Sequence, residues 1–540
     1  MKFAIQNGVS EWAYTSGKKY ADPFNEVQLD VVFADADGRE KRVPAFWSGE
    51  QVWRVRYSSP EVGRVRYRTE CSDAGNADLH GQEGALDVQP YEGANPLFAH
   101  GPLRVSENQR HFEHLDGTPF FWLGDTWWMG FTRRLDWPGG FHELTADRVS
   151  KGVSVIQIVA GLYPDMPPFD ERGANEAGFP WEPDYARINP AYFDMADLRM
   201  DYLVRNGLVP CVVACWGYFL KWMGVEKIKQ HWRYLIARWG AYPTVWCLAG
   251  EGNMPYYLSE DKEQDQALLR KGWTEVGAWI QGMDPYDHPV TIHPGSASRH
   301  IVDDPGVLDF EMLQTGHGDR SSLPNTVKVM AQSYSAEPRM PVLNSEVCYE
   351  GIGEQCRQEV QRIMFWTSIL SGGCGHTYGA NGIWQVNGRE KPYGPSPHGM
   401  AWGNTPWEDA MKLPGSGHLG LAKKLLERYD WWDFQPHPEW IDPHSEEEDF
   451  TAPYAAGIPG VVRIIYFPTF PWCDVRVTNL EKDGVYEGFL FNPASGETHP
   501  LGEMRSDSDN ACVLQKMNAS GPLRLTFPLY QDWLLVMEAR

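Results

Sequence analysis

Short apolar stretches alternate with longer helical patterns between residues 120 and 378, and this alternation limits the possible folds strongly. The stretches are nearly continuous runs of apolar and β-branched residues, which is typical of parallel strands covered on both faces. Strands that alternate with helices indicate βαβ units. Eight such stretches therefore predict an α/β fold, a (β/α)8 TIM barrel, with strands at 120–126, 153–159, 208–214, 244–250, 289–293, 308–314, 342–346 and 373–378.

Two of these stretches end at a glutamate. The fourth runs into Gly250-Glu251-Gly252 and the seventh ends at Glu346. A lone glutamate at a strand end is usually a helix cap or a surface charge, but barrels place their chemistry at the C-terminal ends of strands. Cleavage of a glycosidic bond needs one carboxyl as the acid and a second as nucleophile or base. We predict that Glu251 and Glu346 are catalytic, and an acid/base after strand four with a nucleophile after strand seven predicts a retaining mechanism.

The flanking segments have the patterns of β-sandwiches. Apolar and polar residues alternate at 27–33, 52–57 and 64–69, with short turns between, so we expect residues 1–95 to form an immunoglobulin-like sandwich. Asn95-Pro96 marks the boundary, and a hairpin at 103–105 and 112–114 leads into a barrel domain at 96–436. Residues 437–540 are predicted to form a C-terminal β-sandwich, with strands at 461–467, 475–477, 487–492, 523–527 and 533–537.

Two long insertions follow predicted barrel strands. Residues 161–188 and 387–414 are rich in Pro and Gly, and neither contains a clear helix or strand pattern. Long structureless insertions in compact domains tend to be functional lids. We expect both to cover the active face and to leave a closed pocket there instead of an open groove.

Charge and cysteine content narrow the partners and the compartment. The formal net charge is −24, from 48 basic and 72 acidic residues, which speaks against nucleic acid or an anionic membrane as partner. No apolar run reaches 18 residues, so no membrane span is expected. The first residues lack the apolar segment of a secretory signal, and the nine cysteines are scattered. These features predict reduced thiols and a cytoplasmic protein.

Polar and aromatic side chains near the strand ends are candidates for sugar contacts. The chain has 24 Trp; most indoles belong to cores, but those beside strand ends or in Gly-rich loops offer faces on which a sugar ring stacks. Asp125 is either a cap or a hydrogen-bond partner of sugar hydroxyls, and lone histidines are more often structural. The predicted substrate-binding residues are Asp125, Trp127, Trp128, Trp216, His293, His317, His376, Tyr378 and Trp384, with Gln157 and Asn344 as weaker candidates and Trp402 as a further stacking candidate.

A metal or cofactor site is not indicated. Metal-dependent barrel hydrolases usually carry His-x-His after the first strand, where this chain has Gly124-Asp125-Thr126. There is no His-Glu-x-x-His or Cys-x-x-Cys motif. Cys211 and Cys215 point in the same direction on one strand but have no nearby partners in the sequence. The Gly-rich spots match neither a phosphate loop nor a dinucleotide fingerprint, and a Gly-x-Ser-x-Gly elbow is absent. We predict no metal and no cofactor.

Three segments resemble the apiosidase-like glycoside hydrolases: Phe121-Trp-Leu-Gly-Asp-Thr-Trp-Trp, Trp246-Cys-Leu-Ala-Gly-Glu-Gly-Asn and Pro341-Val-Leu-Asn-Ser-Glu. That family has clan-A-like barrels, often with an immunoglobulin-like domain before the barrel and a β-sandwich after it. The resemblance implies that Glu251 is the acid/base, that Glu346 is the nucleophile and that Asp125 lies in the glycone pocket. One departure is that the usual clan pattern has Asn before the acid, to hold the sugar 2-hydroxyl, where this chain has Gly250.

The sequence thus predicts an exo-acting, retaining glycoside hydrolase that removes a small sugar, a furanosyl group being one option, from an oligosaccharide or glycoside. The alternative from another class is a non-catalytic carbohydrate-binding protein, supported by the two sandwiches and the abundant Trp. A transglycosylase or lyase on the same barrel is a further alternative. The carboxylate pair favours the hydrolase over the carbohydrate-binding protein, because a lectin has no need of two buried acids. The oligomeric state stays open, a homo-oligomer included.

Overall fold

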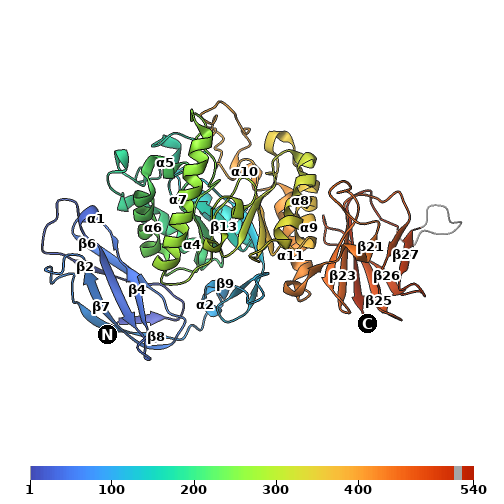
Figure 1. Cartoon of the computed structure of the whole chain (residues 1–540), viewed down its shortest axis with the longest axis horizontal. Coiled ribbons are helices and arrows are strands. Elements are labelled where there is room, and N and C mark those ends of the chain that lie inside the picture. The colour runs from blue at the N-terminus through green and yellow to red at the C-terminus, as the bar shows by residue number, and fades with distance from the viewer. Residues whose placement is uncertain (1, 516–525) are drawn as a thin grey trace.

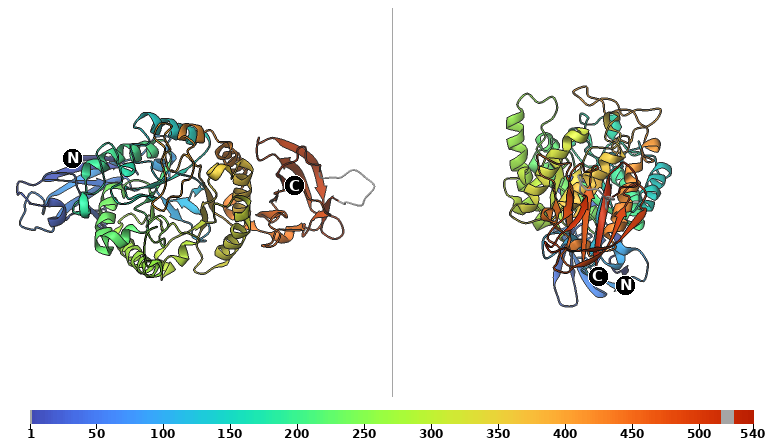
Figure 2. Two further views of the ribbon diagram at one scale, coloured as in Figure 1. Left: turned by 90° about the horizontal axis from the view of Figure 1, so that it is seen from above. Right: turned by 90° about the vertical axis from the view of Figure 1, so that its right-hand side faces the viewer.

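The computed structural model describes residues 2–515 and 526–540, which form three parts in a row. An all-β domain and a second all-β domain lie on opposite sides of a central α/β barrel (Figure 1). Seen from above, helices form a ring around the barrel strands (Figure 2). No helix among the described residues is both long and apolar enough to cross a membrane.

The barrel is an eight-stranded parallel sheet in the order β16-β15-β14-β13-β12-β19-β18-β17. Each predicted stretch contains one of these strands, so the barrel prediction is confirmed. The sheet nearly closes between β16 and β17, where the backbone N–H of Asp309 donates to the carbonyl of Val290 at 2.8 Å. The strands are β12 (Trp122–Thr126), β13 (Val155–Val159), β14 (Val209–Val213), β15 (Val245–Cys247), β16 (Val290–Thr291), β17 (Glu311–Gln314), β18 (Val342–Glu346) and β19 (Gly375–Tyr378).

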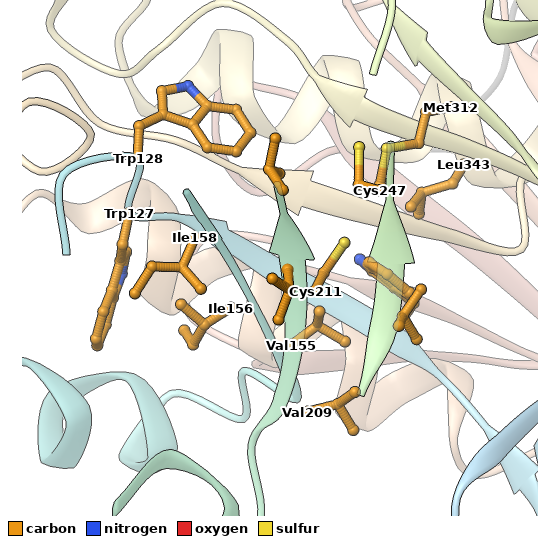
Figure 3. Packing of buried hydrophobic residues seen from close by; sticks show 14 of the residues in the cluster. Trp127, Trp128, Val155, Ile156, Ile158, Val209, Cys211, Cys247, Met312 and Leu343 are labelled. Carbon is orange, nitrogen blue, oxygen red and sulfur yellow. The ribbon is translucent and has the colours of Figure 1, made fainter. Parts of the chain in front are cut away.

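Helices on the outside and side chains on the inside bury both faces of these strands, which explains their continuous apolar sequences. The helices are α3 (Gly139–Ser150), α4 (Pro190–Arg205), α5 (Phe219–Met223), α6 (Val225–Trp239), α7 (Lys262–Met283), α8 (Leu323–Ser335), α9 (Gln358–Leu370), α10 (Trp407–Ala410) and α11 (Pro414–Leu426). Figure 3 shows Cys211 of β14 and Cys247 of β15 among the apolar core residues. Burial raises the pKa of the Cys247 thiol to about 12, so this thiol acts as a small apolar core group.

The N-terminal domain consists of two facing sheets, as predicted. Their orders are β1-β8-β7-β3-β4 and β2-β6-β5, and Val31, Trp53 and Val55 belong to the buried core between them. The strands are β1 (Lys2–Ile5), β2 (Ser10–Thr15), β3 (Leu29–Ala34), β4 (Glu40–Pro44), β5 (Phe46–Trp47), β6 (Val52–Tyr57), β7 (Gly63–Cys71) and β8 (Glu83–Gln89), with short helices α1 (Pro23–Glu26) and α2 (Pro96–Ala99).

The predicted hairpin is present and closes the N-terminal end of the barrel. It comprises β9 (Leu103–Val105) and β10 (Phe112–His114), with β11 (Pro119–Phe120) as a third strand. The ring of Phe112 lies 5.3 Å from that of Trp122, which begins β12, and 4.9 Å from that of Phe310, just before β17. The opposite, C-terminal end of the strands is left for the active site.

The C-terminal domain is also a two-sheet sandwich, with orders β20-β22-β23-β28-β25-β26 and β21-β24-β27. β22 of the larger sheet packs against α9 of the barrel, and the buried guanidinium of Arg362 in α9 binds the carboxylate of Asp532 at 2.6 Å. The strand predicted at 523–527 lies mostly outside the described residues. The strands are β20 (Gln435–Pro436), β21 (Ile441–Asp442), β22 (Tyr454–Ile458), β23 (Val462–Phe467), β24 (Val475–Val477), β25 (Val485–Phe491), β26 (Thr498–Arg505), β27 (Cys512–Gln515) and β28 (Trp533–Ala539).

Candidate active site

Both predicted glutamates line one pocket at the C-terminal ends of the barrel strands. Glu346 is the last residue of β18, whereas Glu251 follows β15 by four residues and has a left-handed backbone with φ of 41°. The pocket has a volume of about 190 Å³ and is lined by Trp128, Pro164, Asp165, Trp216, Glu251, Met254, Tyr257, Gln314, His317, Glu346, Tyr349, Ile352, Trp384, His398 and Trp402.

The side-chain amide of Gln314 joins the two glutamates. Gln314 is the last residue of β17, and its Nε2 lies 3.3 Å from Oε1 of Glu251 and 3.0 Å from Oε1 of Glu346. The two oxygens therefore cannot be further apart than the sum of these distances. The sequence prediction did not single out Gln314, although it ends its strand just as Glu346 ends β18.

Two imidazoles hold Glu346 in its ionised form. Nε2 of His317 lies 2.8 Å from Oε1 of Glu346, and Nε2 of His293 lies 3.2 Å from Oε2. Burial alone would raise the pKa of Glu346, but the hydrogen bonds and charges of these histidines outweigh burial and lower the pKa to about 2. For His317 burial has the opposite effect and lowers the pKa. The contact with Glu346 outweighs burial, so the pKa of His317 is raised overall.

Glu251 has the opposite electrostatic environment. Burial raises its pKa, and the negative charge of Glu346 raises it further, to about 7, against the opposing effects of His293 and Gln314. Between these two pKa values, the pocket thus contains an ionised carboxylate beside a carboxyl group that holds a proton. Such a separation of two pKa values assigns the acid and the nucleophile or base of a two-carboxylate site.

Aromatic side chains form the walls of the pocket. The indole Nε1 of Trp216 donates to Oε2 of Glu251 at 3.3 Å, and that of Trp128 donates to the hydroxyl of Tyr349 at 2.9 Å. The rings of Tyr349 and Trp384 stack with centroids 5.9 Å apart. These faces offer surfaces for the apolar faces of a sugar ring, while the N–H groups orient the polar atoms.

The glycine before the acid is explained by Trp216. A Cβ atom added to Gly250 would lie 2.2 Å from two carbon atoms of the Trp216 ring. The ring of Trp216 therefore occupies the space that a side chain at residue 250 would need. In this chain an indole packs beside the acid and donates to it.

The structure brings part of the predicted binding set to the pocket. Trp128, Trp216, His317 and Trp384 line it, and His293 reaches it through Glu346. Five other predicted residues are buried and do not line it: Asp125, Trp127, Gln157, His376 and Tyr378. Their role as sugar ligands is not supported by this geometry.

Asp125 is engaged in a buried ion pair. Its Oδ2 accepts hydrogen bonds from Nε of Arg148 and, at 2.8 Å, from Nε1 of Trp127, and Asp125 and Arg148 are both fully buried. Trp127 and Trp128 point to opposite sides of the segment after β12 (Figure 3), and Trp127 packs edge-on against Phe141 of α3. In this structure Asp125 thus links β12 and α3.

The other three residues lie on β13 and β19, and only Gln157 contacts a neighbour of Glu346, whereas His376 packs against Phe365 of α9. Nε2 of Gln157 donates to the carbonyl of Ser345, next to Glu346, at 3.2 Å. The hydroxyl of Tyr378 donates to Glu350. Burial lowers the pKa of His376 to about 3, so its imidazole is neutral. The weaker candidate Asn344 is fully buried as well.

Both predicted lid insertions contribute to the pocket. Pro164 and Asp165 come from 161–188, and His398 and Trp402 come from 387–414. The sequence predicts a role for Trp402 but not for Pro164, Asp165 or His398. The path of a long loop, and therefore which of its residues reach the pocket, cannot be derived from its composition. Among the described residues, no group of three or more His, Cys, Asp or Glu side chains is arranged to hold a metal ion.

A (β/α)8 barrel with two carboxyl groups in a pocket at the strand ends is the arrangement expected of a glycoside hydrolase. The family described as "Apiosidase-like, catalytic domain" matches residues 106–433, so the chain belongs to the apiosidase-like family of glycoside hydrolases. A domain of unknown function, DUF5060, matches residues 6–72 in the N-terminal sandwich.

Solved structures agree with this fold. A protein described as a glycoside hydrolase is 22% identical with a TM-score of 0.65, over 83% of this chain and 98% of that one. A glycoside hydrolase family 5 protein from Bacteroides vulgatus is 21% identical with a TM-score of 0.66, over 82% and 95%. A putative glycoside hydrolase from the same organism is 17% identical with a TM-score of 0.71 over the whole of both chains. No match was found among curated proteins.

Proposed function

We propose that this enzyme is an exo-acting, retaining glycoside hydrolase with Glu346 as the nucleophile and Glu251 as the acid/base. The observation that carries the proposal is the shared contact of Gln314. The sum of its distances to the two carboxylate oxygens, 3.3 and 3.0 Å, is below the separation of about 6.5–9.5 Å found in inverting enzymes and compatible with the about 5–5.5 Å of retaining ones.

In the first step, an oxygen of Glu346 forms a bond to the anomeric carbon while the bond to the leaving oxygen breaks. Glu251 donates its proton to that oxygen, which departs as an alcohol. In the second step, Glu251 accepts a proton from water, the water oxygen attacks the anomeric carbon and Glu346 is released as a carboxylate. Gln314 donates to one oxygen of each glutamate and holds the two side chains at a fixed separation.

The size of the pocket supports exo action on a single small sugar. Its volume of about 190 Å³ is below the about 300–1,000 Å³ of pockets that hold drug-sized ligands. Residues of both insertions contribute to its lining, which limits how far a polysaccharide could extend on either side. The proposed substrate is therefore an oligosaccharide or glycoside with a small terminal sugar, a furanosyl group being one option.

The compartment remains a proposal too. Cys71, Cys211, Cys215, Cys247, Cys348, Cys356, Cys374 and Cys473 are free thiols, and of these only Cys473 is exposed. This state supports the cytoplasm, where thiols stay reduced.

A panel of 4-nitrophenyl α- and β-glycosides, pyranosides and furanosides, tests the proposal. We expect release of 4-nitrophenol from at least one member, with kcat/KM lowered by at least about a thousandfold in Glu251→Ala and Glu346→Ala, which is about 4 kcal/mol in the barrier. Glu260→Ala is the matched control, because Glu260 is exposed on the loop that follows Glu251.

The anomer released first, identified by ¹H NMR, tests retention. Azide added to the inactive variants separates the two roles: Glu251→Ala would yield a glycosyl azide of retained configuration, and Glu346→Ala one of inverted configuration. Full activity in either alanine variant would remove that residue from the chemistry. Sugar binding without turnover of any glycoside would instead favour a carbohydrate-binding protein.

A further inference from the structure

A third carboxylate, that of Asp165, lines the same pocket as Glu251 and Glu346. Asp165 belongs to the 161–188 insertion, is 5% exposed and has a left-handed backbone with φ of 57°. Within residues 2–515 and 526–540, no Lys or Arg lies within ion-pair distance of its oxygens; the nearby guanidinium of Arg172 donates to its backbone carbonyl instead. The mechanism above makes no use of this buried carboxylate.

Two neighbours from other loops fix its orientation. The hydroxyl of Tyr257, on the loop after β15, donates to Oδ1, and Nε1 of Trp402, on the 387–414 insertion, donates to Oδ2 at 3.0 Å. The ring of His398 stacks on Tyr257 with centroids 4.7 Å apart. Three loops that are far apart in the sequence thus converge on one carboxylate.

The hydrogen bonds leave accepting capacity on both oxygens. An ionised carboxylate has about four acceptor sites, and each oxygen of Asp165 has one donor in the structure. The remaining sites suit two further donors on adjacent atoms. Two neighbouring hydroxyl groups of a sugar ring match this spacing, and hydrogen bonds to a charged acceptor are stronger than neutral ones.

The burial of the Asp165 carboxylate without a cation is energetically unfavourable. Burial raises the pKa of Asp165, against the hydrogen bonds of Tyr257 and Trp402, and a buried carboxylate without a cation is normally unfavourable.

We propose that Asp165 determines the specificity of the pocket by accepting hydrogen bonds from two neighbouring hydroxyl groups of the bound sugar, while Tyr257 and Trp402 hold the carboxylate in place. The choice of a sugar as the ligand rests on the proposed function. A sugar with a cationic amino group and a purely structural clasp are the two competing roles, and they give different outcomes below.

The test compares deoxy substrates in two forms of the enzyme. The probes are the aryl glycoside that is turned over fastest in the panel and its monodeoxy derivatives in the glycone. In the wild type, removal of either contacted hydroxyl is expected to lower kcat/KM by at least tenfold. In Asp165→Ala the parent glycoside is expected to lose at least 100-fold, and the further loss on removal of those hydroxyls is expected to disappear.

Tyr257→Phe is the matched variant for the clasp. It removes one donor to Asp165 but keeps the carboxylate, so it is expected to retain the full penalty for each deoxy substrate, with a smaller loss on the parent. Equal penalties for every deoxy substrate in the wild type and in Asp165→Ala would reduce Asp165 to a clasp and overturn the inference. Faster turnover of an amino-glycoside than of its hydroxyl parent, lost in Asp165→Ala, would also overturn it.

A binding experiment separates failure of this inference from failure of the proposed function. Quenching of tryptophan fluorescence by free monosaccharides is measured in Glu346→Gln, with and without Asp165→Ala, after thermal unfolding has shown that both variants fold. Sugar binding that requires Asp165, without turnover of any glycoside, would reject the hydrolase and keep the recognition site. Sugar binding of equal strength in both variants would reject the recognition site whatever the panel shows.

Discussion

Nε2 of His317 lies 2.8 Å from Oε1 of Glu346. His317 belongs to the loop after β17 and Glu346 ends β18, so two neighbouring strands bring an imidazole against a carboxylate. The same contact raises the pKa of the histidine and lowers that of the glutamate. Glu251 lacks such a contact, which is why two residues of the same type differ in charge in one pocket.

The first prediction concerns the pH dependence of kcat/KM. Activity needs Glu346 ionised, with a pKa of about 2, and Glu251 protonated, with a pKa of about 7. The wild-type profile should therefore be flat from about pH 4 to 6 and fall above pH 7. His317→Gln removes one cause of the low pKa of Glu346, so its acidic limb should move up into the measured range, with a lower maximum.

The control for this change is His300→Gln, because His300 is exposed and outside the pocket. It should leave both limbs in place. An acidic limb that stays where it is in His317→Gln would show that His317 does not set the charge of Glu346.

The second prediction concerns stability. The pKa of Glu251 is raised from 4.5 to about 7 on folding, so the folded state binds the proton more tightly; this contribution is complete below pH 4.5 and is lost as the pH rises through 7. Glu251→Gln does not titrate. Between pH 5 and pH 8 the wild type should therefore lose about 1–3 kcal/mol of its free energy of unfolding relative to Glu251→Gln. One pKa unit is worth about 1.36 kcal/mol, and the range allows for the partial exposure of Glu251.

Urea denaturation of both proteins at pH 5 and pH 8 measures this difference. Glu260→Gln serves as the reference for loss of an exposed charge. An equal difference at the two pH values would mean that the pKa of Glu251 is not raised.

The third prediction concerns Gly250. Its added Cβ in Gly250→Ala would collide with the ring of Trp216, so the indole must move and its hydrogen bond to Glu251 must lengthen. We expect a loss of about 1–3 kcal/mol in stability from overpacking and at least a tenfold drop in kcat/KM. Gly282→Ala is the control, because a Cβ there meets no atom within 4 Å. Wild-type kinetics in Gly250→Ala would show that the position of Trp216 is not needed.

The sequence predicts the barrel well because each buried strand is a local pattern: an apolar run followed by a polar residue at its C-terminal end. The same pattern reveals Glu251 and Glu346, since both stand at strand ends. It does not reveal Asp165, because a long loop carries it and contacts with other loops decide its place, and it does not reveal Tyr349, which lies three residues after β18. Asp125 shows a limit of this pattern: it ends a strand, as a sugar contact would, but Arg148 of the next helix pairs with it.

The last prediction tests that reading of Asp125. Asp125→Asn keeps the size of the side chain but leaves the fully buried Arg148 with only Asp147 as a charged partner. Removal of one partner of a buried ion pair costs about 3–5 kcal/mol of stability. Because Asp147 remains, we expect the free energy of unfolding to fall by about 3 kcal/mol. KM should change by less than about threefold, as Asp125 does not line the pocket.

The double variant with Arg148→Met separates structure from binding. Removal of both charges eliminates the unpaired cation, so the double variant should be more stable than Asp125→Asn alone, and urea denaturation measures this recovery. If Asp125 bound the sugar, the double variant would recover stability, but its KM would still be at least tenfold above the wild-type value. Wild-type KM in both variants would fix the role of Asp125 as a buried link between β12 and α3.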